Sequence, residues 1–191
     1  MGADLRNNGQ FVTTGVPSTV NETAANQFIA GQLGHVAALL DASPSGAGLP
    51  RLWQYILHSG TSAVTVVAGM TALWKDYDDF VVTPDSSDSF DASGSNHVAG
   101  TFIGVTPTSA NYGYVQVGGI AKQLFKITPA TTPTTAGLPV VAGTDGQADT
   151  YASWATSTTN SIRPYGKTIA AGASTASTSS DIILLVDRVG W

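Results

Sequence analysis

Three histidines, His35, His58 and His97, are the residues best suited to acid–base or metal chemistry in this sequence. They lie in three separate segments, and no pair has the HExxH spacing that places two ligands on one helical face. The sequence also contains no GxSxG elbow, no Walker loop and no GxGxxG after a predicted strand. It therefore predicts no catalytic centre and no cofactor, although a hydrolase triad built from distant residues would leave no such motif.

Two groups of aspartates could supply oxygen ligands to a calcium ion: Asp76, Asp78 and Asp79, and then Asp85, Asp88 and Asp91. Neither group follows the EF-hand spacing. Aspartate is also favoured in hairpin turns, because its side chain bonds to nearby backbone N–H groups. The pattern therefore favours turns, and we predict no metal site.

Six aromatic residues could form a sugar-stacking face: Trp53, Tyr55, Trp74, Tyr77, Tyr112 and Tyr114. Such a face would suit a protein that binds glycans. Aromatic residues at alternating strand positions more often belong to the core, because they pack well on a pleated surface. Both interpretations stay open from the sequence.

The composition limits the possible partners. Charged residues make up 11% of the 191 residues, far below the usual quarter, and the net charge is −5. The basic residues are scattered, whereas nucleic acid binding needs a clustered basic face. There is no cysteine, so disulfides and thiolate metal sites are excluded. The N-terminus has no hydrophobic signal core and no apolar run approaches the ~20 residues of a membrane helix. We expect a protein made in the cytoplasm that has no membrane or nucleic acid partner.

Residues 98–125 are the stretch around which the remaining elements are expected to assemble. Three short apolar runs, VAGTFIGV, YGYVQV and GIAKQLF, are separated by turn residues, as in a β-meander. The first break contains Asn111, Tyr112 and Gly113. The second is Gly118 and Gly119, which predict a hairpin turn or a bulge because glycine adopts positive φ at little cost.

Further strand pairs are predicted on both sides of this meander. Residues 52–57 and 62–67 flank a first hairpin, and residues 71–75 and 80–83 flank an acidic turn. Asp145 and Gly146 predict a two-residue hairpin turn between residues 139–142 and 148–152. Residues 128–138, with two prolines, are expected to form an exposed loop. The apolar run at 181–189 predicts a central strand buried on both faces.

The N-terminal part has a different composition. Residues 1–20, which include Asn8, Gly9 and Phe11, show little apolar periodicity and suit an extended arm. Residues 19–40 are ambiguous: a capping box and an apolar face favour a helix, whereas Gly31 and Gly34 oppose it. We therefore expect a mainly β fold. An arm and connecting segment (1–50), with at most one short helix, would precede an antiparallel β-sandwich or barrel-like body (51–191).

Four strings in the chain are similar to a known family. AGMTALWKD (68–76), FVVTPD (80–85), VAG (98–100) and NYGYVQVGG (111–119) resemble structural head proteins of tailed bacteriophages. The chain looks most like the small decoration, or cement, proteins of the outer capsid, and the resemblance covers roughly residues 67–121 and the final strand. It implies a β-rich body without catalytic residues. It also implies a homotrimer seated where capsid hexamers meet, with an arm that grips the major capsid protein.

The expected function is therefore that of a structural virion protein on the outer capsid surface, which stabilises the shell and is not an enzyme. Candidate turn or interface residues are Asn8, Gly9, Phe11, Trp74, Asn111, Tyr112, Gly113, Gly118, Gly119 and Trp191. One alternative is a virion or tail-associated adhesin that binds host glycans through exposed Trp and Tyr. A second is a hydrolase whose triad is hidden in the sequence.

Overall fold

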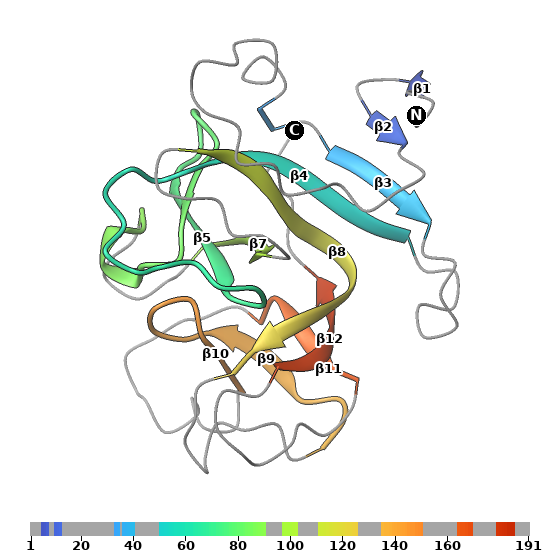
Figure 1. Ribbon diagram of the computed structural model, residues 1–191. Coiled ribbons are helices and arrows are strands. Elements are labelled where there is room, and N and C mark those ends of the chain that lie inside the picture. Colours follow the sequence, from blue (N-terminus) through green and yellow to red (C-terminus); the bar gives the residue numbers. More distant parts are fainter. Residues whose placement is uncertain are drawn as a thin grey trace.

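The computed structural model is built almost entirely from β-strands (Figure 1). It describes residues 5–7, 10–12, 33–34, 36–40, 50–90, 97–102, 111–125, 135–150, 164–169 and 179–185. Its elements are β1 (Leu5–Asn7), β2 (Gln10–Val12), β3 (Val36–Leu40), β4 (Pro50–His58), β5 (Thr71–Asp76), β6 (Val81–Thr83), η1 (Ser86–Asp88), β7 (Val98–Phe102), β8 (Tyr112–Leu124), β9 (Pro139–Ala142), β10 (Ala148–Thr150), β11 (Gly166–Thr168) and β12 (Ser179–Leu185). The short 3₁₀ turn η1 is the one helical element among these residues. The predicted mainly β, barrel-like fold is confirmed.

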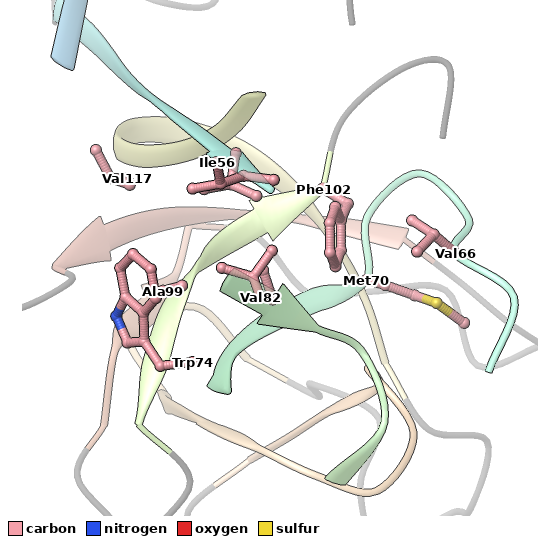
Figure 2. Packing of buried hydrophobic residues seen from close by; sticks show 10 residues of the cluster. Ile56, Val66, Met70, Trp74, Val82, Ala99, Phe102 and Val117 are labelled. Atoms are coloured by element: carbon pink, nitrogen blue, oxygen red, sulfur yellow. The ribbon is translucent and has the colours of Figure 1, made fainter. Parts of the chain in front are cut away.

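Five strands form a closed barrel in the order β4-β6-β5-β7-β8, because β8 pairs back onto β4. All neighbours in the barrel are antiparallel except β4 and β6, which are parallel. Apolar side chains from every strand fill its interior (Figure 2). This core consists of Ile56, Val66, Met70, Ala72, Trp74, Val82, Ala99, Phe102, Val115 and Val117.

The long strand β8 bends at Gly118 and Gly119 and changes partners there (Figure 1). Before the bend it pairs with β4, and from Gly118 onward it pairs with β12. Trp53 lies opposite Gln116 but Leu52 lies opposite Gly118, which leaves one extra residue in β8. The predicted bulge is thus confirmed and the hairpin turn is wrong. Gly119 has φ 83°, which explains why glycine is needed at this position.

The side chain of Gln116 stabilises this bend from inside. Its Nε2 donates to the carbonyls of Gly118 at 2.9 Å and Ile120 at 2.8 Å, and the residue is 1% exposed. A bulge interrupts the regular ladder, so carbonyls beside it need other donors.

The second half of β8 starts another curved sheet, in the order β8-β12-β11-β9-β10. An isolated parallel bridge between Phe125 and Ala148 brings β10 back to the end of β8. The sheet encloses a second core of Leu73, Ala121, Phe125, Val140, Ala142, Ala148, Tyr165, Ile182 and Leu184. Two curved units therefore share β8, and β5 contributes to both cores through Ala72 on one side and Leu73 on the other.

Two predicted hairpins are confirmed. β5 and β6 pair across the acidic turn, and β9 and β10 pair across Asp145 and Gly146. Asp145 has φ 53° and Gly146 φ 72°, as a type I′ turn requires. The carbonyl of Gly146 accepts the N–H of Thr71 at 2.6 Å, which ties this hairpin to the barrel.

The predicted hairpin between residues 52–57 and 62–67 is wrong. One edge of β4 is paired with β8, while the other is shared by β3 and β6, so β4 has no edge left for a further strand. Residues 59–70 instead form turns and irregular structure. Val66 and Met70 from this connection join the barrel core (Figure 2).

The C-terminal strand β12 is correctly predicted as internal, since it pairs with both β8 and β11. Burial on both faces is wrong, because Ile183 is 36% exposed between buried Ile182 and Leu184. The curved sheet covers one face of β12 with its own core and leaves the other face uncovered.

Two segments of the predicted arm, β1 and β2, form an antiparallel hairpin at one end of the sheet. β2 lies parallel to β3, and β3 is antiparallel to β4. Residues 36–40 therefore do not form a helix. They form β3, which pairs with residues 50–54 of β4, on the part of that edge that β6 does not occupy. A turn at Gly34 with φ 79° precedes β3. Residues 19–32 lie outside the described residues, and the division at residue 50 stays a prediction.

Candidate functional site

The predicted turn and interface residues of the body lie in or beside the strands. Trp74 is 5% exposed and Tyr112 9%, and both are packed rather than displayed. Asn111 accepts the N–H of His58 on its carbonyl at 2.9 Å, directly before β8, and Gly113 is buried within β8. Gly118 and Gly119 form the bend described above. Phe11 lies in β2, whereas Asn8, Gly9 and Trp191 lie outside the described residues.

The aromatic residues proposed for sugar stacking are mostly core residues. Trp53 is 1% exposed, Tyr55 2%, Trp74 5% and Tyr112 9%, while Tyr77 and Tyr114 are half-buried. Tyr55 stacks on Tyr112 with ring centroids 6.0 Å apart and planes at 14°. The two tryptophans and two of the four tyrosines in this set are therefore buried and do not form an exposed platform.

A different set of rings reaches the surface beside the β5–β6 turn. Tyr77, Phe90 and His97, which we call the aromatic corner, are in mutual contact, with centroid distances of 5.3, 5.7 and 6.3 Å. Phe90 is 64% exposed and His97 is also exposed. Sequence reasoning missed Phe90, although a single phenylalanine in the polar string SSDSFDASGSN was the available signal.

The backbone of Trp74 positions the aromatic corner. Its carbonyl accepts the N–H of Phe90 at 2.8 Å, and its N–H donates to the carbonyl of His97 at 2.9 Å. The Trp74 ring lies 5.5 Å from Tyr77 and 6.2 Å from Phe80, below the exposed rings. The exposed corner is thus attached to the barrel core through one buried residue.

A polar network, which we call the latch, fixes the segment before Phe90 to the barrel. Lys75 Nζ lies 2.6 Å from Asp88 Oδ1 and also donates to Ser59 Oγ at 3.1 Å and to Thr61 Oγ1. Ser59 and Thr61 donate to the two oxygens of Asp88 at 2.7 and 2.9 Å. The latch joins β5, η1 and the chain that follows β4.

The pair of Ser59 and Lys75 has the atoms of a nucleophile and a base. Lys75 Nζ donates to Ser59 Oγ at 3.1 Å, however, and the Ser59 hydroxyl donates to Asp88 Oδ2 at 2.7 Å rather than to the lysine. Ser59 is also 1% exposed, so a substrate cannot reach its Oγ without rearrangement. The contacts of Ser59 and Lys75 instead hold β5, η1 and the segment after β4 together.

The aspartates considered as calcium ligands have other roles where they are described. Asp76 Oδ1 accepts the N–H groups of Asp78 and Asp79 at 3.0 and 3.3 Å, which shapes the β5–β6 turn. Asp85 caps η1 through the N–H of Ser87 at 2.9 Å. Within the described ranges no three His, Asp or Glu side chains gather as a metal site, and Asp91 lies outside them. No helix in this part of the chain is long and apolar enough to cross a membrane.

The latch is expected to make stability depend on acid. Burial opposes ionisation of Asp88, but hydrogen bonds from Lys75, Ser59 and Thr61 outweigh it and hold the pKa of Asp88 below its ordinary value of 3.8. A lowered folded-state pKa adds stability above the unfolded pKa, and this stability is lost as the pH falls through the folded pKa. Asp88→Asn should therefore cost about 1–2 kcal/mol at pH 7, and this cost should shrink as the pH falls below 3.8 and through the folded-state pKa, as measured by urea unfolding.

The matched control is Asp181→Asn on β12. Asp181 lies 3.4 Å from Lys122, but the two side chains are 46% and 71% exposed, so their ion pair is screened by water. This change should alter stability by less than about 0.5 kcal/mol. If the two substitutions had equal effects, or if the cost of Asp88→Asn persisted in acid, the ionised Asp88 would not be what stabilises the fold through the latch.

Comparison of the chain with protein-family models, with curated proteins and with solved structures gave no match in any of the three.

Proposed function

We propose that this chain is a structural, non-catalytic virion protein that binds the outside of a tailed-phage capsid and stabilises it by bridging neighbouring capsomers. The resemblance of the four strings at 68–76, 80–85, 98–100 and 111–119 to phage head proteins is the sequence feature that suggests this function. The chain is poor in charge, with 11% charged residues, which also suits broad contacts that depend little on ionic strength. The partner is the major capsid protein, and the working form is a homotrimer.

The observation that carries the proposal is how β1 and β2 are attached to the body. β2 contacts β3 through the register pairs Phe11 with Ala37 and Val12 with Ala38, and β1 continues the sheet beyond it. Such short edge strands are held by main-chain hydrogen bonds, which another sheet edge can supply equally well. The same segment can therefore add to the edge of a neighbouring capsid subunit.

Repetition makes this weak attachment effective. Each short strand contributes modest affinity, but many copies bound to one shell hold adjacent capsomers together. A trimer would present three such arms, and the second is engaged at high effective concentration once the first has bound. No catalytic residue is needed for this role.

Deleting residues 1–20 tests the role of the arm. We expect the shortened chain to load purified shells at least tenfold less than the full chain, because the pairing strands are lost. Loading is measured as copies per shell by quantitative mass spectrometry. The control is thermal unfolding of the shortened chain, which should show that the closed barrel still folds. Full loading by the shortened chain would contradict the arm assignment.

Copy number separates this function from the adhesin alternative. A decoration protein should approach the abundance of the major capsid protein in purified particles, whereas an adhesin should be far rarer. Of the tryptophans that the structure describes, Trp53 and Trp74 are both buried, which does not favour an adhesin that stacks glycans on exposed tryptophan. Broad substrate screening with His58→Ala and His97→Ala addresses the hydrolase alternative.

A further inference from the structure

The three rings of the aromatic corner are set at steep angles to one another. Tyr77 and Phe90 meet at 71°, Tyr77 and His97 at 86°, and Phe90 and His97 at 81°. The three ring planes are thus nearly perpendicular to one another. Phe90 is 64% exposed, and His97 beside it is exposed as well, so two rings of the corner face water.

Perpendicular rings at these separations match the requirements of a cation. Where three perpendicular faces turn toward one point, a group equally distant from them lies at the centroid separation divided by √2, or about 4 Å from each centroid at the separations found here. Cation–π attraction acts within about 6 Å of a centroid. A sugar ring, in contrast, stacks on one broad flat face, which three perpendicular rings do not offer.

The charges around the corner are also complementary to a cation. Tyr77 lies between Asp76 and Asp78 in the β5–β6 turn, and Asp79 follows; all three aspartates are exposed. The nearest described lysine in the sequence, Lys75, is paired with Asp88 in the latch. The corner therefore carries negative charge at its side, which attracts a basic group and repels an acidic one.

We propose that the aromatic corner binds an arginine or lysine side chain of the protein partner. This inference deepens the proposed function, on which it rests for the partner's identity, by assigning a basic chemistry to the capsid surface under the barrel. The arm then supplies main-chain pairing, while the corner supplies a side-chain contact that selects register.

The direct test is a titration of the full chain with N-acetyl-arginine amide, followed by NMR of its aromatic resonances. N-acetyl-citrulline amide is the matched probe, because it has nearly the same shape without the charge. We expect arginine to shift the signals of Tyr77, Phe90 and His97 with millimolar affinity, and citrulline to bind at least tenfold more weakly. Equal binding of the two probes, or shifts located elsewhere, would overturn the proposal.

Two substitutions identify the source of the affinity. Phe90→Leu keeps an apolar side chain but removes the ring, and should weaken arginine binding about fivefold, whereas Phe90→Trp should retain it. The control is Ile183→Ala, which alters an exposed apolar residue on β12 and should have no effect. N-acetylglucosamine binding at the corner without arginine binding would identify a glycan site and reject the proposal.

Shell loading separates this proposal from the proposed function. If the chain with Phe90→Leu loads fully while the chain without residues 1–20 does not, the corner has no role on the capsid and the function stands. If even the unaltered chain does not bind shells, the function fails, and the arginine titration still decides whether the corner binds cations.

Discussion

Gln123→Leu is expected to lower the free energy of unfolding by about 3 kcal/mol, because it breaks a buried network and leaves polar groups without partners. Gln123 is fully buried, and its Nε2 donates to the carbonyl of Gly69 at 2.7 Å and to Thr71 Oγ1 at 3.1 Å. Its Oε1 accepts from Thr101 Oγ1 at 2.9 Å. Leucine has a similar size but offers none of these bonds.

Most of the lost stability in Gln123→Leu should come from Thr101, whose hydroxyl is left without its acceptor. The Gly69 carbonyl keeps the N–H of Leu124 at 2.6 Å, and Thr71 keeps the Tyr165 hydroxyl at 2.9 Å. Thr101 is 0% exposed and would lose its side-chain acceptor. Adding Thr101→Val to Gln123→Leu should therefore recover about 1 kcal/mol, since an apolar group then replaces the orphaned hydroxyl. Urea unfolding measures both variants.

Tyr165→Phe is the matched control, because it removes one bond from the same network and keeps the ring. We expect a cost of about 1 kcal/mol. Burial raises the pKa of the Tyr165 hydroxyl, so the neutral phenol is the form that bonds to Thr71. If Gln123→Leu costs no more than Tyr165→Phe, the network does not stabilise the fold.

This network shows where sequence reasoning stops. Thr71, Thr101 and Gln123 lie in β5, β7 and β8, and Tyr165 directly precedes β11, so the bonds join the barrel to the second sheet. Gln123 lies on the same strand face as Ala121 and Phe125, which are both buried. The local pattern does not identify the hydrogen-bond partners of its amide, because these come from distant segments.

The elements that the sequence predicted well are those fixed by local chemistry. The turn at Asp145 and Gly146 needs two positive φ values, and this residue pair supplies them. At Gly118 and Gly119 the same reasoning allowed a turn or a bulge. The outcome was decided by β4 and β12, which lie far away in the chain on either side of β8 and pair with its two halves.

The candidate site followed the same division. Trp74 is among the turn or interface residues predicted from the sequence; it is buried, and its ring lies 5.5 Å from Tyr77 of the aromatic corner. Phe90 was passed over because its neighbours are polar. Exposure of a single side chain depends on what the rest of the chain places over it, so the sequence alone could not rank these two residues.

Gly100→Ala is expected to cost about 3 kcal/mol, at the upper end of the usual range for overpacking, because it forces β7 away from β8. A Cβ at Gly100 would lie 2.5 Å from the carbonyl oxygen of Gln116 and 3.2 Å from its carbonyl carbon. These are backbone atoms of the bent strand and cannot rotate away as a side chain would. The strands must separate, which opens the barrel beside Phe102 and Val115.

Gly137→Ala is the matched control for backbone strain. Gly137 has φ 84° and an added Cβ would meet nothing within 4 Å, so its cost is that of the positive φ alone, about 1–2 kcal/mol. Hydrogen exchange should then show a specific pattern for Gly100→Ala. Amides of β7 and the first half of β8 should lose protection, while those of β11 and β12 around the second core should keep it. Equal costs for the two alanine variants, or uniform loss of protection, would mean that contact between Gly100 and Gln116 does not hold the barrel closed.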